Sequence, residues 1–250
     1  MHVRTLSLFA ALLLGSPLLA QPKPAAARPA VTKAVVKPFA WENRIAMTAQ
    51  GGVLLGNPAA AVKLVEFGSL TCPHCRSFHE TGLPAIKARY LASGRVSYEY
   101  RPFTLNGIDL MAGLVMQCQA AAGAWAFVDR SYSRQDELLL PFQAISEADR
   151  ASITSLPQGA QGPRMAELGK LPEFAAAAGV PRARYDACLA AKPGMDKLLA
   201  IRADAVQTHK LAGTPSFLIN GQMQTDVFDW AALEPLLAAA VKAAPTIRTK

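Results

Sequence analysis

Cys72 and Cys75 are separated by two residues, Pro73 and His74, where an apolar run gives way to a helix-like run. Two cysteines at this spacing on the first turn of a helix can close a disulfide and open it again. The unpaired N–H groups and the positive dipole end of the helix would stabilise a thiolate on Cys72, whereas Cys75 lies one turn further in and is less exposed. The pattern predicts reversible thiol–disulfide chemistry.

Paired cysteines also occur in metal and haem sites. A structural zinc site needs a second pair of ligands at suitable spacing, and the sequence has none. Covalent haem attachment needs a histidine directly after the second cysteine, where this chain has Arg76. We therefore expect no metal and no cofactor, because thiol–disulfide exchange needs only the sulfur atoms.

The first 20 residues predict export. A short basic stretch ends at Arg4, residues 6–14 are apolar, and a segment of mostly small and apolar residues leads to Ala20, which is the pattern of a cleavable secretory signal. The apolar part is too short to span a bilayer. We expect cleavage after Ala20 and a mature protein in an oxidising compartment, where a reactive cysteine pair is more often an oxidant than a reductant.

The segment after the signal reads as a tether. Residues 21–38 are rich in Pro, Ala and Lys and contain no acidic residue and no periodic apolar pattern. The rest of the chain is long enough for one domain with an insertion, and its hydrophobic content of 51% suits a globular protein.

The formal net charge of +8 is poorly distributed for binding nucleic acid. Five positive charges lie before residue 39 and three after residue 241, and the remaining 18 basic residues match the 18 acidic ones. A neutral folded part with basic ends lacks the clustered positive patch of a nucleic-acid site. We therefore expect no nucleic-acid partner and at most a weak attraction to anionic membrane surfaces.

Strand and helix signals alternate along the folded part. Val-rich residues 62–67 predict a buried strand, and Pro73 suits the first turn of the helix that follows. Further signals indicate a strand at 96–100, mostly helix between 109 and 202, a strand at 216–219, a turn at 220–221 and a helix at 229–241. The simplest arrangement is a mixed sheet interrupted by a helical insertion.

Several of these segments together resemble the DsbA family of bacterial thiol-disulfide oxidoreductases. The resemblance rests on residues 65–67, on Cys72-Pro73-His74-Cys75 with Phe78, and on residues 213–217 with 219–221, and it covers about residues 52–241. It implies an α/β thioredoxin fold with an inserted helical domain. It also implies oxidation of newly exported proteins in the periplasm and reoxidation by a quinone-linked membrane partner.

The resemblance also implies a division of the chain. This division is a signal peptide at 1–20, a Pro/Ala-rich tether at 21–38, the first part of the thioredoxin domain at 39–107, the helical insertion at 108–205, the second part at 206–243 and a basic tail at 244–250.

Roles for the site residues follow from the chemistry and from the resemblance. A substrate thiolate would attack Cys72, and a partly positive His74 beside the helix N–H groups would favour the Cys72 thiolate. Glu66 interrupts an apolar strand and matches the family's buried acid, which could exchange a proton with Cys75. The alternative for Glu66 is a strand-end residue that reaches solvent.

Thr214-Pro215 is the second expected element of the site. By sequence alone this pair predicts an ordinary turn. The resemblance implies a cis peptide bond instead, in a loop beside the cysteines where extended backbone can pair with a substrate peptide.

Cys118 and Cys188 are the remaining cysteines. They can bond to each other or stay as buried thiols. In an exported protein we favour a structural disulfide between them.

Three functions compete on this sequence. The first is an oxidase that donates the Cys72–Cys75 disulfide to unfolded, cysteine-containing exported proteins. The second is a disulfide isomerase or reductase on the same fold, and the third is a chaperone-like module that binds unfolded exported proteins. Isomerases of related fold usually carry a folded dimerisation domain before the catalytic one, and residues 21–49 are too short and too rich in Pro and Ala to form it. The oxidase is therefore favoured.

Overall fold

The computed structural model describes residue 2 and residues 40–245. The predicted signal and tether and residues 246–250 of the expected basic tail lie outside the described residues, apart from residue 2. Within the described part of the chain, no helix is both long enough and apolar enough to cross a membrane.

A six-stranded mixed sheet lies at the centre of the described residues. Its strands are β1 (Ile45–Met47), β2 (Val53–Gly56), β3 (Val62–Gly68), β4 (Val96–Pro102), β5 (Ser216–Ile219) and β6 (Gln222–Met223). They lie in the order β1-β2-β4-β3-β5-β6, with β3 parallel to β4 and the other neighbours antiparallel. Because β3 is covered on both faces, its sequence is almost continuously apolar.

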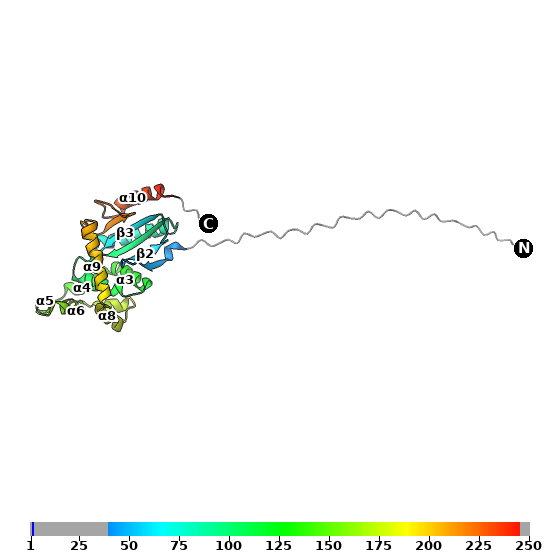
Figure 1. Ribbon diagram of the computed structural model, residues 1–250. Helices are drawn as coiled ribbons and strands as arrows, with labels where there is room; N and C mark the ends of the chain where they lie inside the picture. The colour runs from blue at the N-terminus through cyan, green and yellow to red at the C-terminus, as the bar shows by residue number, and fades with distance from the viewer. Residues whose placement is uncertain (1, 3–39, 246–250) are drawn as a thin grey trace. The chain divides into compact units, whose positions relative to one another are not determined.

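The helices fall into two groups (Figure 1). Those outside the insertion are the short turn η1 (Trp41–Asn43), α1 (Pro73–Ala85) with its π-helical continuation η2 (Ile86–Leu91), and α10 (Trp230–Ala243). Those between β4 and β5 are α2 (Gly107–Gln117), α3 (Ala121–Ser133), α4 (Gln135–Gln143), α5 (Glu147–Thr154), α6 (Gln158–Leu168), α7 (Leu171–Ala177), α8 (Arg182–Leu189), α9 (Lys192–Ala203) and η3 (Asp204–Thr208). In Figure 1 α10 is drawn above the labelled strands, and the insertion helices α3, α4, α5, α6 and α8 are drawn below them. The expected thioredoxin fold with a helical insertion is confirmed.

Alternate residues of β3 face opposite sides of the sheet, as the period of two requires. Leu64 belongs to the large core that includes residues of α1, α3 and α10. Val65 and Phe67 belong to a smaller core with Ile201 and Ala205, which come from α9 and η3. Both faces of β3 are therefore buried, and the polar residue between Val65 and Phe67 must enter the large core.

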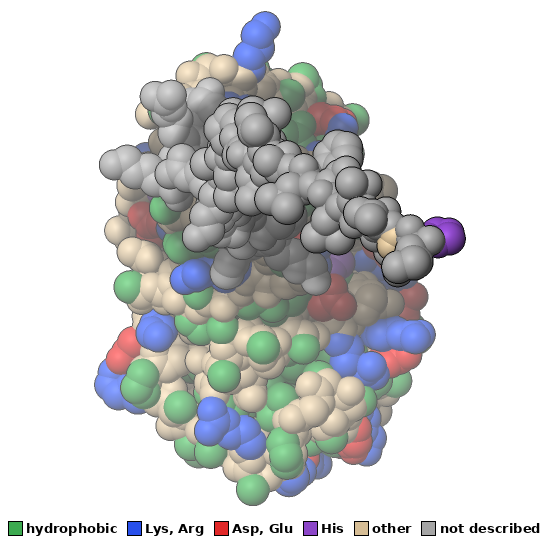
Figure 2. Space-filling model, turned by 90° about the vertical axis from the view of Figure 1, so that its right-hand side faces the viewer, with side chains coloured by type: hydrophobic (Ala, Val, Ile, Leu, Met, Phe, Trp, Pro, Cys, Tyr) green, Lys and Arg blue, Asp and Glu red, His purple; other side chains and the backbone are tan. Residues whose placement is uncertain are grey.

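The described surface carries both signs of charge. On the face shown in Figure 2, Lys and Arg side chains are interspersed with Asp and Glu side chains and with apolar ones, over the part that the grey atoms do not cover.

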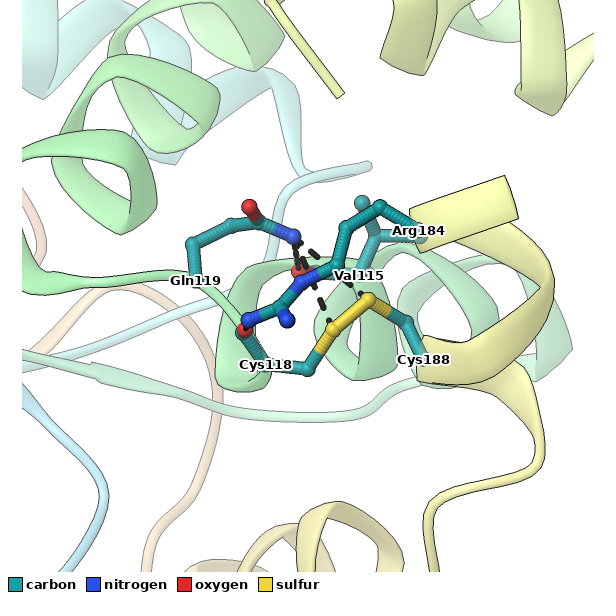
Figure 3. Close-up of a disulfide and its surroundings, with 5 residues drawn as sticks. All are labelled: Val115, Cys118, Gln119, Arg184 and Cys188. Atoms are coloured by element: carbon teal, nitrogen blue, oxygen red, sulfur yellow. Dashed lines mark hydrogen bonds between the residues drawn. A yellow bond between two sulfur atoms is a disulfide. The ribbon is translucent and has the colours of Figure 1, made fainter. Parts of the chain in front are cut away.

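A disulfide joins the end of α2 to α8 (Figure 3). Cys118 caps α2 and bonds to Cys188, with their Cα atoms 5.5 Å apart. The Gln119 Nε2 atom lies 3.6 and 3.5 Å from the two sulfur atoms and donates to the Val115 carbonyl at 3.0 Å. Arg184 of α8 donates to the Cys118 carbonyl. The bond thus ties two insertion helices together across 70 residues of chain.

The disulfide should contribute stability through the unfolded state. Closing a loop of 70 residues removes chain entropy worth about 4 kcal/mol in the entropic model. We expect the variant C118A/C188A to lose free energy of unfolding of about that size, measured by urea titration under non-reducing conditions. In the wild-type protein, alkylation after unfolding without reductant should leave both cysteines unlabelled. Labelling of both would contradict the bond.

Candidate active site

Cys72 is the N-cap residue of α1, and its backbone is extended (φ −83°, ψ 123°). Pro73 follows at the first helical position, where its missing N–H would have had no partner in any case. The Cys72 side chain is 7% exposed and that of Cys75 is fully buried, and both are free thiols. The two sulfurs therefore lie at the N-terminus of one helix in different surroundings.

The surroundings lower the pKa of Cys72 to about 5. The largest cause is a hydrogen bond from the Cys75 thiol, and smaller ones come from the Thr214 side chain and from the backbone N–H groups of Cys75 and His74. Burial opposes them. Because these groups donate to the sulfur, they favour its ionised form.

The pKa of Cys75 is raised well above its ordinary value. Burial is the main cause, and the hydrogen bond to Cys72 and the negative charges of Glu66 and Cys72 act in the same direction. Near neutral pH the pair therefore holds a thiolate on Cys72 and a thiol on Cys75. A thiol of low pKa is a good leaving group, so exchange at Cys72 is favoured.

Glu66 lies on β3 and points into the core, where it is 1% exposed. Its Oε2 atom accepts a hydrogen bond from the Tyr98 hydroxyl, and no donor among the described residues reaches Oε1. Burial raises the pKa of Glu66 to about 8, although the Tyr98 bond lowers it. The packing here is close, because a Cβ on Gly68 would lie 2.8 Å from Oε1 and 2.9 Å from the Tyr132 hydroxyl.

The loop before β5 completes the site. The Thr214–Pro215 peptide bond is cis. The Cys72 sulfur lies 3.3 Å from the Thr214 carbonyl oxygen, to which it donates when protonated. Because β5 runs antiparallel to β3 with Ser216 opposite Phe67, the start of β5 lies at the end of β3 that leads to the cysteines. Pairing of the strands thus brings together residues that are 142 positions apart.

His74 is exposed on the first turn of α1. Its backbone N–H is one of the donors that lower the pKa of Cys72. A contribution from its imidazole stays a prediction.

Three residues of the insertion that the sequence patterns do not single out contact the loop before Cys72. These are Asp109 on α2, Tyr132 on α3 and Gln135 on α4. The sequence offers a signal for one of them, because Asn106 followed by an acid three residues later is typical of a helix start. Nothing local to the other two indicates their contacts.

Glu66 should act as a proton donor and acceptor for Cys75. A carboxyl whose pKa is about 8 still carries a proton near neutral pH, and it can supply that proton as Cys75 leaves. We expect E66Q to slow the opening of the Cys72–Cys75 disulfide by reduced glutathione about tenfold or more at pH 7. We also expect the pH dependence near 8 to disappear in stopped-flow measurements.

E99Q is the matched control, because Glu99 lies on the neighbouring strand β4, opposite Val65, and pairs with Arg101. It should leave both the rate and the pH dependence near the wild-type values. Equal rates for E66Q and the wild type would contradict the role of Glu66.

Comparison with known proteins places this geometry in a family. A family model described as Thioredoxin matches residues 48–239. A Rickettsia felis protein named "Putative protein-disulfide oxidoreductase" is 29% identical over 170 residues, which cover 68% of this chain and 53% of the relative. A Bacillus cereus protein named "Probable disulfide bond formation protein D" is 29% identical over 179 residues, covering 70% and 73%. The chain thus spans about half the length of the Rickettsia felis relative.

Two solved structures resemble the chain. The protein-disulfide isomerase from Novosphingobium aromaticivorans is 31% identical with a TM-score of 0.71, covering 76% of this chain and 97% of that one. Wolbachia pipientis alpha-DsbA1 is 21% identical with a TM-score of 0.61, covering 78% and 94%, and shares the fold. The chain belongs to the thioredoxin family, and it shares with the DsbA1 structure a fold in which a helical insertion separates strands of the sheet.

Proposed function

We propose that this protein is an exported dithiol oxidase, which donates the Cys72–Cys75 disulfide to newly exported proteins. The observation that carries the proposal is that the pKa values of the two thiols shift in opposite directions: the pKa of Cys72 falls to about 5, and that of Cys75 rises. A pair whose attacked sulfur is stable as a thiolate favours the reduced protein, which makes its disulfide a strong oxidant.

The reaction runs in two exchange steps. A substrate thiolate attacks the Cys72 sulfur, the Cys72–Cys75 bond breaks, and Cys75 leaves and takes a proton, for which Glu66 is the nearby donor. A second substrate thiolate then attacks the substrate sulfur of the mixed disulfide, and Cys72 leaves as a thiolate. The substrate loses two electrons and gains a disulfide, while the protein gains two electrons as a dithiol.

A pocket of about 310 Å³ lies next to the residues that flank the cis-proline bond, and it is lined in part by Ser216, Met223 and Phe228. Its mixed polar and apolar lining suits extended peptides of varied sequence, such as unfolded cysteine-containing proteins. We propose that the backbone at Thr214 and Pro215 pairs with such a peptide while its sulfur is bound to Cys72.

The proposal includes the cellular setting and the division of the chain. Residues 1–20 direct export to the periplasm, residues 21–38 form the tether, and the helical insertion spans 108–205. Each turnover leaves the cysteine pair reduced, so a further oxidant must regenerate the disulfide. We propose a quinone-linked membrane oxidase for this step.

Disulfide isomerisation is the second candidate. The observation that favours it is the 31% identity to a solved structure described as a protein-disulfide isomerase. An oxidase accelerates disulfide formation in a reduced test protein, whereas an isomerase restores activity to a scrambled one. We expect the first assay to respond strongly and the second weakly, and the reverse result would favour the isomerase.

The reduced protein should be more stable than the oxidised one. Because folding lowers the pKa of Cys72 to about 5, the thiolate stabilises the folded dithiol form. This contribution is present in full above the unfolded cysteine pKa, about 8.5, and disappears as the pH falls through about 5. We expect the reduced form to have the higher urea midpoint at pH 7, and the difference to vanish near pH 4. A tenfold change in the ionisation constant corresponds to about 1.4 kcal/mol.

This comparison needs the second disulfide to be constant. Reduction of Cys118–Cys188 would lower the stability of the reduced sample and hide the effect. The C118A/C188A background removes that complication. An oxidised form that is clearly the more stable one would contradict strong oxidant chemistry and favour a thioredoxin-like reductant.

A further inference from the structure

Asp109 belongs to the helical insertion, but its carboxylate contacts the loop that leads to the cysteines. Its Oδ1 atom accepts a hydrogen bond from the Thr71 backbone N–H at 3.1 Å. Its Oδ2 atom accepts from the Ser69 hydroxyl at 2.9 Å, from the Thr71 hydroxyl at 3.2 Å and from the Leu105 N–H at 3.0 Å. Three of the four donors thus lie in residues 69–71, directly before Cys72.

Two other insertion side chains contact the same loop from α3 and α4. The Tyr132 hydroxyl donates to the Ser69 carbonyl at 3.1 Å. The Gln135 Nε2 atom donates to the Leu70 carbonyl at 2.9 Å and to the Cys72 carbonyl at 3.0 Å. The insertion therefore supplies both donors and acceptors to the backbone of residues 69–72, and Asp109 is the acceptor in this set.

The burial of Asp109 is not explained by its place on α2. It is the third residue of the helix and 3% exposed. Asp149 holds the same position on α5, yet it is only partly buried, and its side chain bonds only within its own helix start, to Ser146. A carboxylate in the core costs free energy unless several donors satisfy it, and those of Asp109 come mostly from the active-site loop.

We propose that Asp109 is a positioning residue for Cys72, which fixes residues 69–71 and thereby sets the direction of the first turn of α1. The thiolate of Cys72 depends on the Cys75 thiol, on the Thr214 side chain and on the N–H groups of that turn, and these hydrogen bonds weaken steeply with misalignment. This inference rests on the proposed function, because it concerns the strength of Cys72 as an oxidant.

Positioning and direct electrostatics predict opposite changes in the pKa of Cys72 when Asp109 is lost. If Asp109 acts by alignment, its loss misaligns the donors and raises the pKa of Cys72. If Asp109 acts mainly as a nearby negative charge, its loss removes a repulsion and lowers the pKa of Cys72. A change that merely loosens the fold would lower stability and leave the pKa of Cys72 unchanged.

The test compares the wild-type chain with D109A and D109N. Thiolate absorbance gives the pKa of Cys72, equilibrium with glutathione gives the redox constant, and urea titration gives the stability of both redox forms. We expect D109A to raise the pKa of Cys72 and to shift the glutathione equilibrium about threefold or more toward the disulfide form, as half a pKa unit would. D109N keeps the shape but loses one backbone acceptor, so it should move in the same direction by less.

Two further variants keep the test decisive. D149N changes an aspartate at the same helix position without a loop contact, and it should leave the pKa of Cys72 at the wild-type value. S69A removes one donor to Asp109, together with an acceptor of the Thr71 N–H, and keeps the backbone. It serves if D109A does not fold, and it should raise the pKa of Cys72 slightly.

An unchanged or lowered pKa of Cys72 in both D109N and S69A would overturn the positioning role. The proposed function is tested separately, by the glutathione equilibrium of the wild-type protein.

Discussion

The structure depends on keeping one sulfur ionised and its neighbour protonated within a single helical turn. Cys72 at the N-cap receives hydrogen bonds from Cys75 and from the helix N–H groups, whereas Cys75 faces the core and loses solvation. These conditions require a helix end that is open on one side and a dense core directly behind it. The large core of the sheet, α1, α3 and α10 provides the second condition, and the loops at the end of β3 provide the first.

The order of strands explains why the site lies at the carboxyl end of the central strand β3. The central strand β3 delivers the chain to α1 at its carboxyl end, and antiparallel β5 starts at the same end. The cis-proline loop and the cysteines therefore lie side by side, although they are far apart in the sequence. The insertion begins after β4, which is parallel to β3, so the carboxyl ends of the two strands lie together. This position lets α2, α3 and α4 reach the loop before Cys72.

Two buried acids near the cysteines differ in how many donors they receive. Glu66 accepts one hydrogen bond, from Tyr98, and its pKa rises to about 8. Asp109 accepts four, and although burial also raises its pKa, the hydrogen bonds from Ser69, Leu105 and Thr71 oppose that effect. Donor number therefore separates a carboxyl that can carry a proton near neutral pH from one that is held by fixed contacts.

The sequence by itself determined the features that depend on neighbouring residues. The cysteine spacing with Pro73 defines the helix start, the apolar run defines β3, and Asn220-Gly221 makes the turn between β5 and β6, because each is set by local backbone preference or by burial of a whole segment. Strands β1 and β2 carry no clear sequence signal because they are short, and β1 is only half buried.

Only the tertiary structure decided which distant residues meet. The carbonyl of Thr214 lies at Cys72, and Asp109 and Gln135 hold the loop before it, across 142, 38 and 63 positions of chain. No local pattern encodes these contacts, because they arise where strand pairing and helix packing bring separate segments together. One short motif therefore supplies the reacting cysteines, while the packing of the sheet and the insertion sets the ionisation of their two sulfurs.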